Sequence, residues 1–234
     1  MQTQRMYLAD LQRAISADRF GAYTLPSDVS ELDAFARYLW NVALSEALFP
    51  VLQALEVTLR NSLHTAVARH GGTAMWFDAV PSILYPSELS KIGEAKGKLL
   101  LERKPVDAGH VVAELTFGFW TSLLDKRYER KLWPSLLKST FPGMPRHIRT
   151  RGELSKRLNR IRKLRNRVFH HESILKWGAP DLVAQHTEIQ AVIGWMSTPM
   201  RDTIGLLDRF DTVYANGPAF YRHSLDGQLG TMSP

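Results

Sequence analysis

The chain has 234 residues, and 44% of them are hydrophobic, which is enough for a globular core and argues against wholesale disorder. It carries 30 Lys and Arg against 23 Asp and Glu, and the resulting net charge of +7 favours a polyanionic partner such as nucleic acid or an anionic membrane surface. It contains no cysteine, which excludes disulfides, zinc–thiolate sites and cysteine nucleophiles.

The first twenty residues are interrupted by charges, among them Arg5, Asp10 and Arg13, and hold no apolar stretch of signal-peptide length. Elsewhere the sequence shows no uninterrupted apolar run of roughly 18 residues, the length that a membrane span needs. We therefore expect a cytoplasmic protein with no membrane span and no membrane partner.

Apolar residues recur at helical spacing along the chain, and no convincing strand pattern is present. Leu8, Leu11 and Ile15 indicate a short first helix, and Pro50 is expected to separate two long helices. Further helices are expected at about residues 31–49, 51–69, 87–102, 107–123, 127–138, 152–169, 181–196 and 200–214. The sequence thus predicts an all-α bundle, with one domain over residues 1–215 and a flexible C-terminal tail over 216–234.

The helix before residue 170 is strongly basic: residues 146–167 read RHIRTRGELSKRLNRIRKLRNR. An apolar stripe from Leu154 to Val168 predicts the face that packs, and the other faces carry eight Arg and two Lys against the single acid Glu153. Such a face is either a solvated surface or a phosphate-binding one, and the one-signed charge favours phosphate. The candidates for RNA-backbone contacts are Arg149, Arg157, Arg160, Arg162, Lys163 and Arg167.

This basic helix, placed at about residues 147–171, ends in the sequence RNRVFHHE, residues 165–172. Cleavage of RNA without a metal needs a base for the 2′-hydroxyl, an acid for the leaving 5′-oxygen and a fixed cation for the phosphorane. His170 is suited to base or acid near neutral pH, and Arg165 supplies a permanent cation. Asn166 can orient either group by hydrogen bonding.

Helical geometry limits whether Arg165 and His170 can act on the same phosphate within one chain. Asn166 and His170 share one face at i, i+4, whereas Arg165 and His170 leave a straight helix roughly 140° apart. They converge only if the helix is distorted near the motif, or if two chains related by a two-fold axis each lend half of a shared site.

The motif resembles the R-x4-6-H signature of HEPN domains, in the Asn-containing form common in Abi-like (abortive infection) proteins. The stretches LSEALFPVLQALEVTLRN (44–61), FGFW (117–120) and YERKLW (128–133) are also similar to that family, so that the resemblance covers about Arg37 to Trp177. It implies a HEPN-like helical bundle with additional helices, usually dimeric. The implied activity is a metal-independent endoribonuclease without cofactor, in phage defence or toxin–antitoxin systems, with RNA as substrate and a protein or RNA antitoxin as a further partner.

Within this resemblance Arg165 and His170 match the catalytic pair, and Asn166 matches the polar position after the Arg. One position departs from the pattern. HEPN toxins that are neutralised by tyrosine nucleotidylation carry Tyr two residues after the His, and here that residue is Glu172. We therefore do not expect that form of control.

Several other residues are auxiliary candidates with two readings each. A polar stripe next to Asn61 is formed by Glu56, Arg60 and His64. These residues either form ion pairs on the surface or help to order the side chains of the catalytic site. His171 is either a second imidazole of the site or a helix cap. No metal site is expected, because adjacent side chains such as His170, His171 and Glu172 diverge on a helix. The aromatic residues Phe117, Phe119, Trp120 and Trp133 favour the core over base stacking.

Two functions from different classes follow from the residues. The first is a ribonuclease that leaves a 2′,3′-cyclic phosphate. The alternative is a HEPN-like module that binds RNA, such as a structured antitoxin RNA, without cutting it. A structural interaction protein that uses the helical surface is a third and weaker reading.

Overall fold

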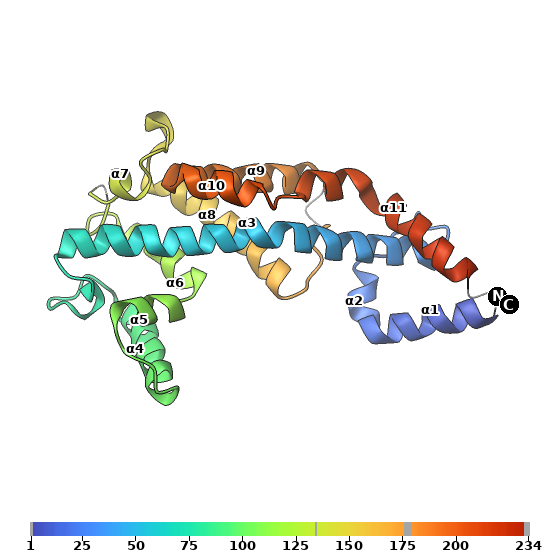
Figure 1. Cartoon of the computed structure of the whole chain (residues 1–234), viewed down its shortest axis with the longest axis horizontal. Coiled ribbons are helices and arrows are strands. Elements are labelled where there is room, and N and C mark those ends of the chain that lie inside the picture. The colour runs from blue at the N-terminus through green and yellow to red at the C-terminus, as the bar shows by residue number, and fades with distance from the viewer. Residues whose placement is uncertain (1, 134, 176–178, 232–234) are drawn as a thin grey trace. The chain divides into compact units, whose positions relative to one another are not determined.

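The computed structural model describes residues 2–133, 135–175 and 179–231 (Figure 1). Within these ranges it consists of helices and contains no strand, which confirms the all-α class. Trp177, the end of the family resemblance, lies outside the described residues. The α-helices are α1 (Gln2–Ile15), α2 (Ala17–Gly21), α3 (Glu31–Gly71), α4 (Pro86–Leu101), α5 (Ala108–Glu114), α6 (Phe117–Ser122), α7 (Leu137–Thr140), α8 (Arg151–Phe169), α9 (Ala179–Met196), α10 (Thr198–Gly205) and α11 (Phe210–Gly230), and the 3-10 helices are η1 (Trp76–Asp78), η2 (Lys126–Tyr128) and η3 (Arg146–Ile148).

The described chain divides into two compact units. The first unit comprises Met1–Pro50, Leu164–His186 and Leu207–Pro234, and the second comprises Val51–Lys163 and Thr187–Leu206. Helices α3, α8 and α9 each contribute residues to both units.

The first unit has a core formed by α1, α2, the start of α3 and the end of α11. Its buried members are Ile15, Phe20, Tyr23, Ala34, Phe35 and Leu225. The side chain of Gln4 on α1 also donates to the carbonyl of Leu229 on α11, at 2.9 Å. Within the segment expected to be a C-terminal tail, the chain is helical to Gly230, with a break at Gly217 (φ 60°), and Leu225 and Leu229 are buried.

The second unit is built around large aromatic side chains. Trp120 and Phe119 are completely buried, and their rings meet edge to face with centroids 5.0 Å apart. Phe117 and Trp133 are 2% exposed. The interpretation of these four aromatic residues as core is therefore confirmed.

Helix α3 is continuous through Pro50, where the sequence predicted a separation of two helices (Figure 1). Proline removes one backbone hydrogen bond, but Leu48, Val51 and Leu52 around it are at most 2% exposed, so apolar burial on both sides favours an unbroken helix. Among the described helices, α3 is also the one long and apolar enough to cross a membrane. Half of its most apolar window (50%) is buried inside the protein, and a core helix passes the same test, so the absence of a membrane span stays a prediction.

The expected helices at 107–123 and 127–138 are wrong in their extent. The first is split into α5 and α6, because the Thr116 side chain caps a new helix by accepting from the Phe119 amide. The second is replaced by η2 and the short α7. Between them, the Trp133 Nε1 donates to the carbonyl of Leu123 at 2.8 Å, a tertiary contact that a local helical pattern does not reveal.

The expected helix at 200–214 is also divided, into α10 and the first part of α11. Asp208 lies between them, and its Oδ1 accepts from the Phe210 amide at 3.0 Å. Its Oδ2 lies 2.8 Å from His186 Nε2, and the His186 ring stacks on Phe210. This buried polar contact fixes the corner inside the first unit.

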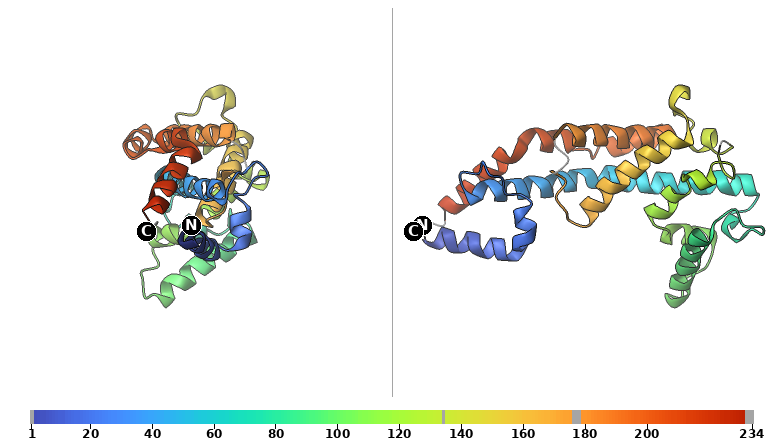
Figure 2. Two further views of the ribbon diagram at one scale, coloured as in Figure 1. Left: turned by 90° about the vertical axis from the view of Figure 1, so that its right-hand side faces the viewer. Right: turned by 180° about the vertical axis from the view of Figure 1, so that it is seen from behind.

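The basic helix is confirmed as α8, seen from behind in Figure 2 as one regular helix. It begins at Arg151, one residue before the helix expected at 152–169, and η3 occupies residues 146–148 of the wider range of about 147–171. Its apolar stripe is buried as predicted, with exposed fractions of 0–6%, and consists of Leu154, Leu158, Ile161, Leu164 and Val168.

Candidate active site

The end of α8 carries the RNRVFHHE motif and has a defined hydrogen-bond pattern. The amide of His170 still donates to the carbonyl of Asn166 (2.9 Å), as in a helix. The amide of His171 donates to Val168 (3.2 Å) and that of Glu172 to Arg167 (2.9 Å). This pair of bonds is a Schellman motif, and His171 occupies its left-handed position with φ 56°.

A histidine in that position is uncommon, since an L side chain in the left-handed region is strained and glycine is the usual occupant. His171 therefore terminates the helix through its backbone, which is the capping role that we considered. Its imidazole is exposed and borders a cavity, so the side chain is also free to contact a ligand there.

The motif side chains are accessible. Asn166 and His170 are exposed, while Arg165 is half-buried. Because α8 is helical through Phe169 and His170 keeps its helical hydrogen bond, the distortion that would bring Arg165 to His170 within one chain is not present. The two side chains leave the helix roughly 140° apart.

Arg165 rests on an aromatic platform in the first unit. Its guanidinium carbon lies 4.2 Å from the centroid of the Phe169 ring, a cation–π contact. Phe169 in turn stacks on Phe49 of α3, with centroids 5.5 Å apart and ring planes at 28°. Arg165 Nη1 also lies 3.5 Å from the Oδ1 of Asn166. The guanidinium is thus held beside the polar residue that follows it in the motif.

A cavity of about 670 Å³ lies beside the motif, within the first unit. Its wall on the α8 side is formed by Val168 and His171, and the α3 wall combines aromatic and polar side chains. Residues of that α3 wall include Tyr38, Asn41, Val42, Ser45, Glu46 and Phe49. Phe49 is 46% exposed, so an aromatic face remains available to a ligand. The cavity has the size and mixed character of a small-molecule or nucleotide pocket.

The segment after the motif is fastened to α3 and α8. The amide of Ile174 donates to the Oδ1 of the buried Asn41 at 2.8 Å. Arg167 donates from Nη1 to the carbonyl of Ser173 (3.0 Å) and lies 3.6 Å from the Glu172 carboxylate. Arg167, a candidate for RNA contacts, therefore also holds this turn in place.

In the second unit, several of the predicted RNA-binding residues have partners inside the protein. Arg149 donates from Nε to the carbonyl of Met144 (2.8 Å) and from Nη2 to that of Pro142 (3.2 Å). Arg157 pairs with Glu188 at 2.7 Å. The positive charge of α8 is thus partly neutralised by Glu188, which lies far away in the sequence. The sequence of α8 alone, with its single acid, did not predict this ion pair.

The other predicted phosphate contacts lie differently. Arg160 and Lys163 are exposed on α8. Arg162 is half-buried and lines a second, small cavity together with Asn159.

The auxiliary candidates on α3 belong to the second unit, whereas the motif belongs to the first. Glu56, Arg60 and His64 are half-buried and Asn61 is exposed. His64 Nδ1 accepts a hydrogen bond from Trp76 Nε1 at 3.0 Å, and burial lowers the pKa of His64. His64 therefore fastens η1 to α3, a structural role that the sequence did not indicate.

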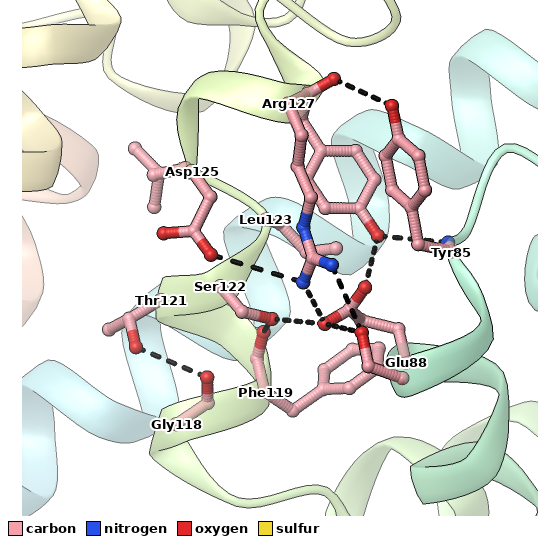
Figure 3. Close-up of polar contacts among 12 residues, drawn as sticks. Tyr85, Glu88, Gly118, Phe119, Thr121, Ser122, Leu123, Asp125 and Arg127 are labelled. Carbon is pink, nitrogen blue, oxygen red and sulfur yellow. Dashed lines mark hydrogen bonds and ion pairs between the residues drawn. The ribbon is translucent and has the colours of Figure 1, made fainter.

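Sequence reasoning missed one polar cluster altogether, around the buried carboxylate of Glu88 at the start of α4 (Figure 3). A signal existed, because a charged residue three positions into a helix is a common N-terminal feature, but its burial depends on partners about 40 residues away. Among the described residues, no group of three or more His, Asp or Glu is placed to hold a metal ion.

The arrangement at the end of α8 offers two exposed imidazoles, a guanidinium on an aromatic platform and an amide beside it. An imidazole can act as a general acid or base, and a fixed guanidinium can stabilise an anion. Comparisons with protein-family models, with curated proteins and with solved structures find no match for this chain. The likeness to HEPN and Abi-like proteins therefore stays a prediction from the motif.

Proposed function

We propose that the protein is a metal-independent endoribonuclease of the HEPN type, acting in the cytoplasm in abortive-infection or toxin–antitoxin defence. The observation that carries the proposal is the group of side chains at the end of a basic helix, in which Asn166, His170 and His171 are exposed and Arg165 is half-buried. RNA cleavage of this kind needs no group beyond a proton acceptor, a proton donor and a fixed cation.

In the proposed reaction the 2′-oxygen attacks the adjacent phosphorus and the bond from phosphorus to the 5′-oxygen breaks. One imidazole takes the proton of the 2′-hydroxyl, and a second protonated group gives a proton to the leaving 5′-oxygen, so that a 2′,3′-cyclic phosphate and a 5′-hydroxyl form. His170 acts as base or acid, and Arg165 stabilises the charge on phosphorus. Asn166 orients the guanidinium, as its 3.5 Å approach supports.

The site is proposed to be completed by a second copy of the chain. Within one chain Arg165 and His170 diverge, so a two-fold dimer would combine the Arg165 of one copy with the His170 of the other. An antitoxin, protein or RNA, is a further partner that this function implies.

The direct test is cleavage of a defined RNA by purified protein in EDTA. Wild type should give products with cyclic-phosphate ends, and His170→Ala and Arg165→Ala should each lose at least about 100-fold in rate. His223→Ala, which removes an exposed histidine on α11, is the matched control and should keep full activity. RNA that is bound but left intact by wild type would instead favour the non-catalytic RNA-binding module.

Mixing the two inactive variants tests the shared site. If each site takes its arginine and histidine from different copies, a mixed dimer contains one intact site. Random pairing would then restore about a quarter of wild-type activity. No recovery, from variants that exchange subunits, would place both groups in one chain's site.

A further inference from the structure

The second unit contains a small polar cavity that the proposed ribonuclease site does not use. Its volume is about 250 Å³, and its lining comes from α4, from α6 and the loop that follows, from η2 and from α8. The side chains that matter for its chemistry are Lys91, Asp125, Arg127, Asn159 and Arg162, together with the buried Glu88.

Glu88 forms one wall and is saturated with hydrogen bonds. It is 1% exposed, and its Oε2 accepts from the Tyr128 hydroxyl at 2.6 Å. Its Oε1 accepts from Arg127 (2.5 Å), Ser87 (3.1 Å) and Ser122 (3.2 Å), as Figure 3 shows for the labelled Arg127 and Ser122. A carboxylate offers about four acceptor positions, and the four bonds commit the Glu88 carboxylate mainly to partners inside the protein.

Tyr128 and Arg127 are fixed by the same cluster. Burial and the hydrogen bond to Glu88 raise the pKa of Tyr128, so it remains a phenol that donates. Arg127 lies 5.0 Å from the Tyr85 ring centroid, and its Nη1 donates to Ser87 at 3.1 Å. The wall is therefore rigid, and the negative charge of Glu88 is balanced by Arg127 at contact distance.

The charges left over for a ligand are mainly positive. Lys91 and Arg162 face the cavity against one remaining acid, Asp125, which is 46% exposed and lies 3.9 Å from Arg127. Arg162 is oriented by Nη2, which donates to Asn159 Oδ1 at 3.2 Å, and its Nε is buried with no acceptor in the described part of the chain. A guanidinium fork and an ammonium group are the donors that bind phosphate in proteins.

A divalent cation fits these walls poorly. Magnesium and calcium take several oxygen ligands, whereas this lining offers two carboxylates, Asp125 and the Glu88 group that already accepts four hydrogen bonds. The size is also informative. A cavity of about 250 Å³ corresponds to roughly eight waters and is smaller than the pockets that hold whole drug-sized ligands.

We propose that this cavity binds a phosphate group, with Arg162 and Lys91 as its anchors and the Glu88–Arg127–Tyr128 cluster as its rigid wall. The proposal does not depend on RNA cleavage. Its ligand is either a phosphomonoester, free or at the end of a nucleic acid, or a phosphodiester within RNA.

The test is a calorimetric titration of the full chain with inorganic phosphate at constant ionic strength, set by chloride. Wild type should bind saturably, and Arg162→Ala and Lys91→Ala should each bind at least about tenfold more weakly. Lys156→Ala removes an exposed cation of α8 outside the cavity and should bind like wild type. No saturable binding by wild type, or an equal loss in Lys156→Ala, would overturn the proposal.

Arg162→Lys covers the case in which the alanine variant fails to fold. It keeps the charge and loses the fork, so it should bind with intermediate affinity, and wild-type affinity in it would count against a guanidinium anchor. Circular dichroism checks the fold of each variant.

A pair of short RNAs, one with a 5′-phosphate and one with a 5′-hydroxyl, distinguishes the sources. Preference for the phosphorylated end, with competition by inorganic phosphate, identifies a phosphomonoester. If wild type binds both RNAs equally and Arg162→Ala weakens the binding of both, the ligand is a phosphodiester. If both RNAs bind and Arg162→Ala binds them as strongly as wild type, the proposed site is wrong. Both RNAs carry 2′-O-methyl riboses, which lack the nucleophile of the proposed cleavage, so binding at this cavity is measured separately from ribonuclease activity.

Discussion

His171 allows its backbone role to be separated from any chemical role by two substitutions. Its φ of 56° places an L side chain in the left-handed region at the end of α8. That conformation costs about 1–2 kcal/mol for a residue with a Cβ and nothing for glycine. His171→Ala removes the imidazole and keeps the strain, whereas His171→Gly removes both.

The expected difference follows from these terms. Glycine gains about 1–2 kcal/mol in the folded state but loses about 0.5–1 kcal/mol through its more flexible unfolded chain. His171→Gly should therefore be more stable than His171→Ala by about 1 kcal/mol, measured as the free energy of unfolding in urea. Equal stabilities, or a less stable glycine variant, would refute the strained helix end. RNA cleavage by the two variants should be equal, because both lack the imidazole, and a difference would indicate that the turn's rigidity matters.

Three further predictions concern other side chains. Glu88→Ala should cost about 3 kcal/mol in unfolding free energy, because the buried Tyr128 hydroxyl loses its acceptor along with the charged bonds, and Glu88→Gln should cost less; urea titration of both checks this. Burial lowers the pKa of His64, so the folded state favours the neutral ring, and stability present above pH 6.5 should be lost as the pH falls below it. His64→Gln, which keeps an acceptor for Trp76, should flatten that slope, and an unchanged slope would contradict the assignment. Phe49→Ala removes a 46% exposed ring that stacks on Phe169, so it should cost less than about 2 kcal/mol in unfolding free energy. The same change should weaken RNA binding several-fold in a filter-binding assay, because an exposed ring can stack on a base.

The sequence was sufficient to predict the parts of the fold that local periodicity controls. The stripe from Leu154 to Val168 is buried as its spacing requires, and α8 ends at the motif. The accessibility of His170 and Asn166 could also be anticipated, because they lie away from that stripe.

Features that depend on distant residues could not be predicted. Pro50 lies within α3 because buried residues flank it, and residues 127–138 are not one helix. The segment around Tyr128 instead follows its tertiary bond to Glu88, 40 positions earlier in the chain. The ion pair of Arg157 with Glu188 and the hydrogen bond of His64 with Trp76 escaped the sequence for the same reason.

The role of His170 is tested by cleavage of a defined RNA in EDTA, with wild type compared with His170→Ala and the control His223→Ala. We expect products with 2′,3′-cyclic phosphate ends from wild type and the control, and cleavage at least about 100-fold slower from His170→Ala. Equal cleavage by wild type and a correctly folded His170→Ala would contradict the assignment of His170, and with it the proposed site at the end of α8.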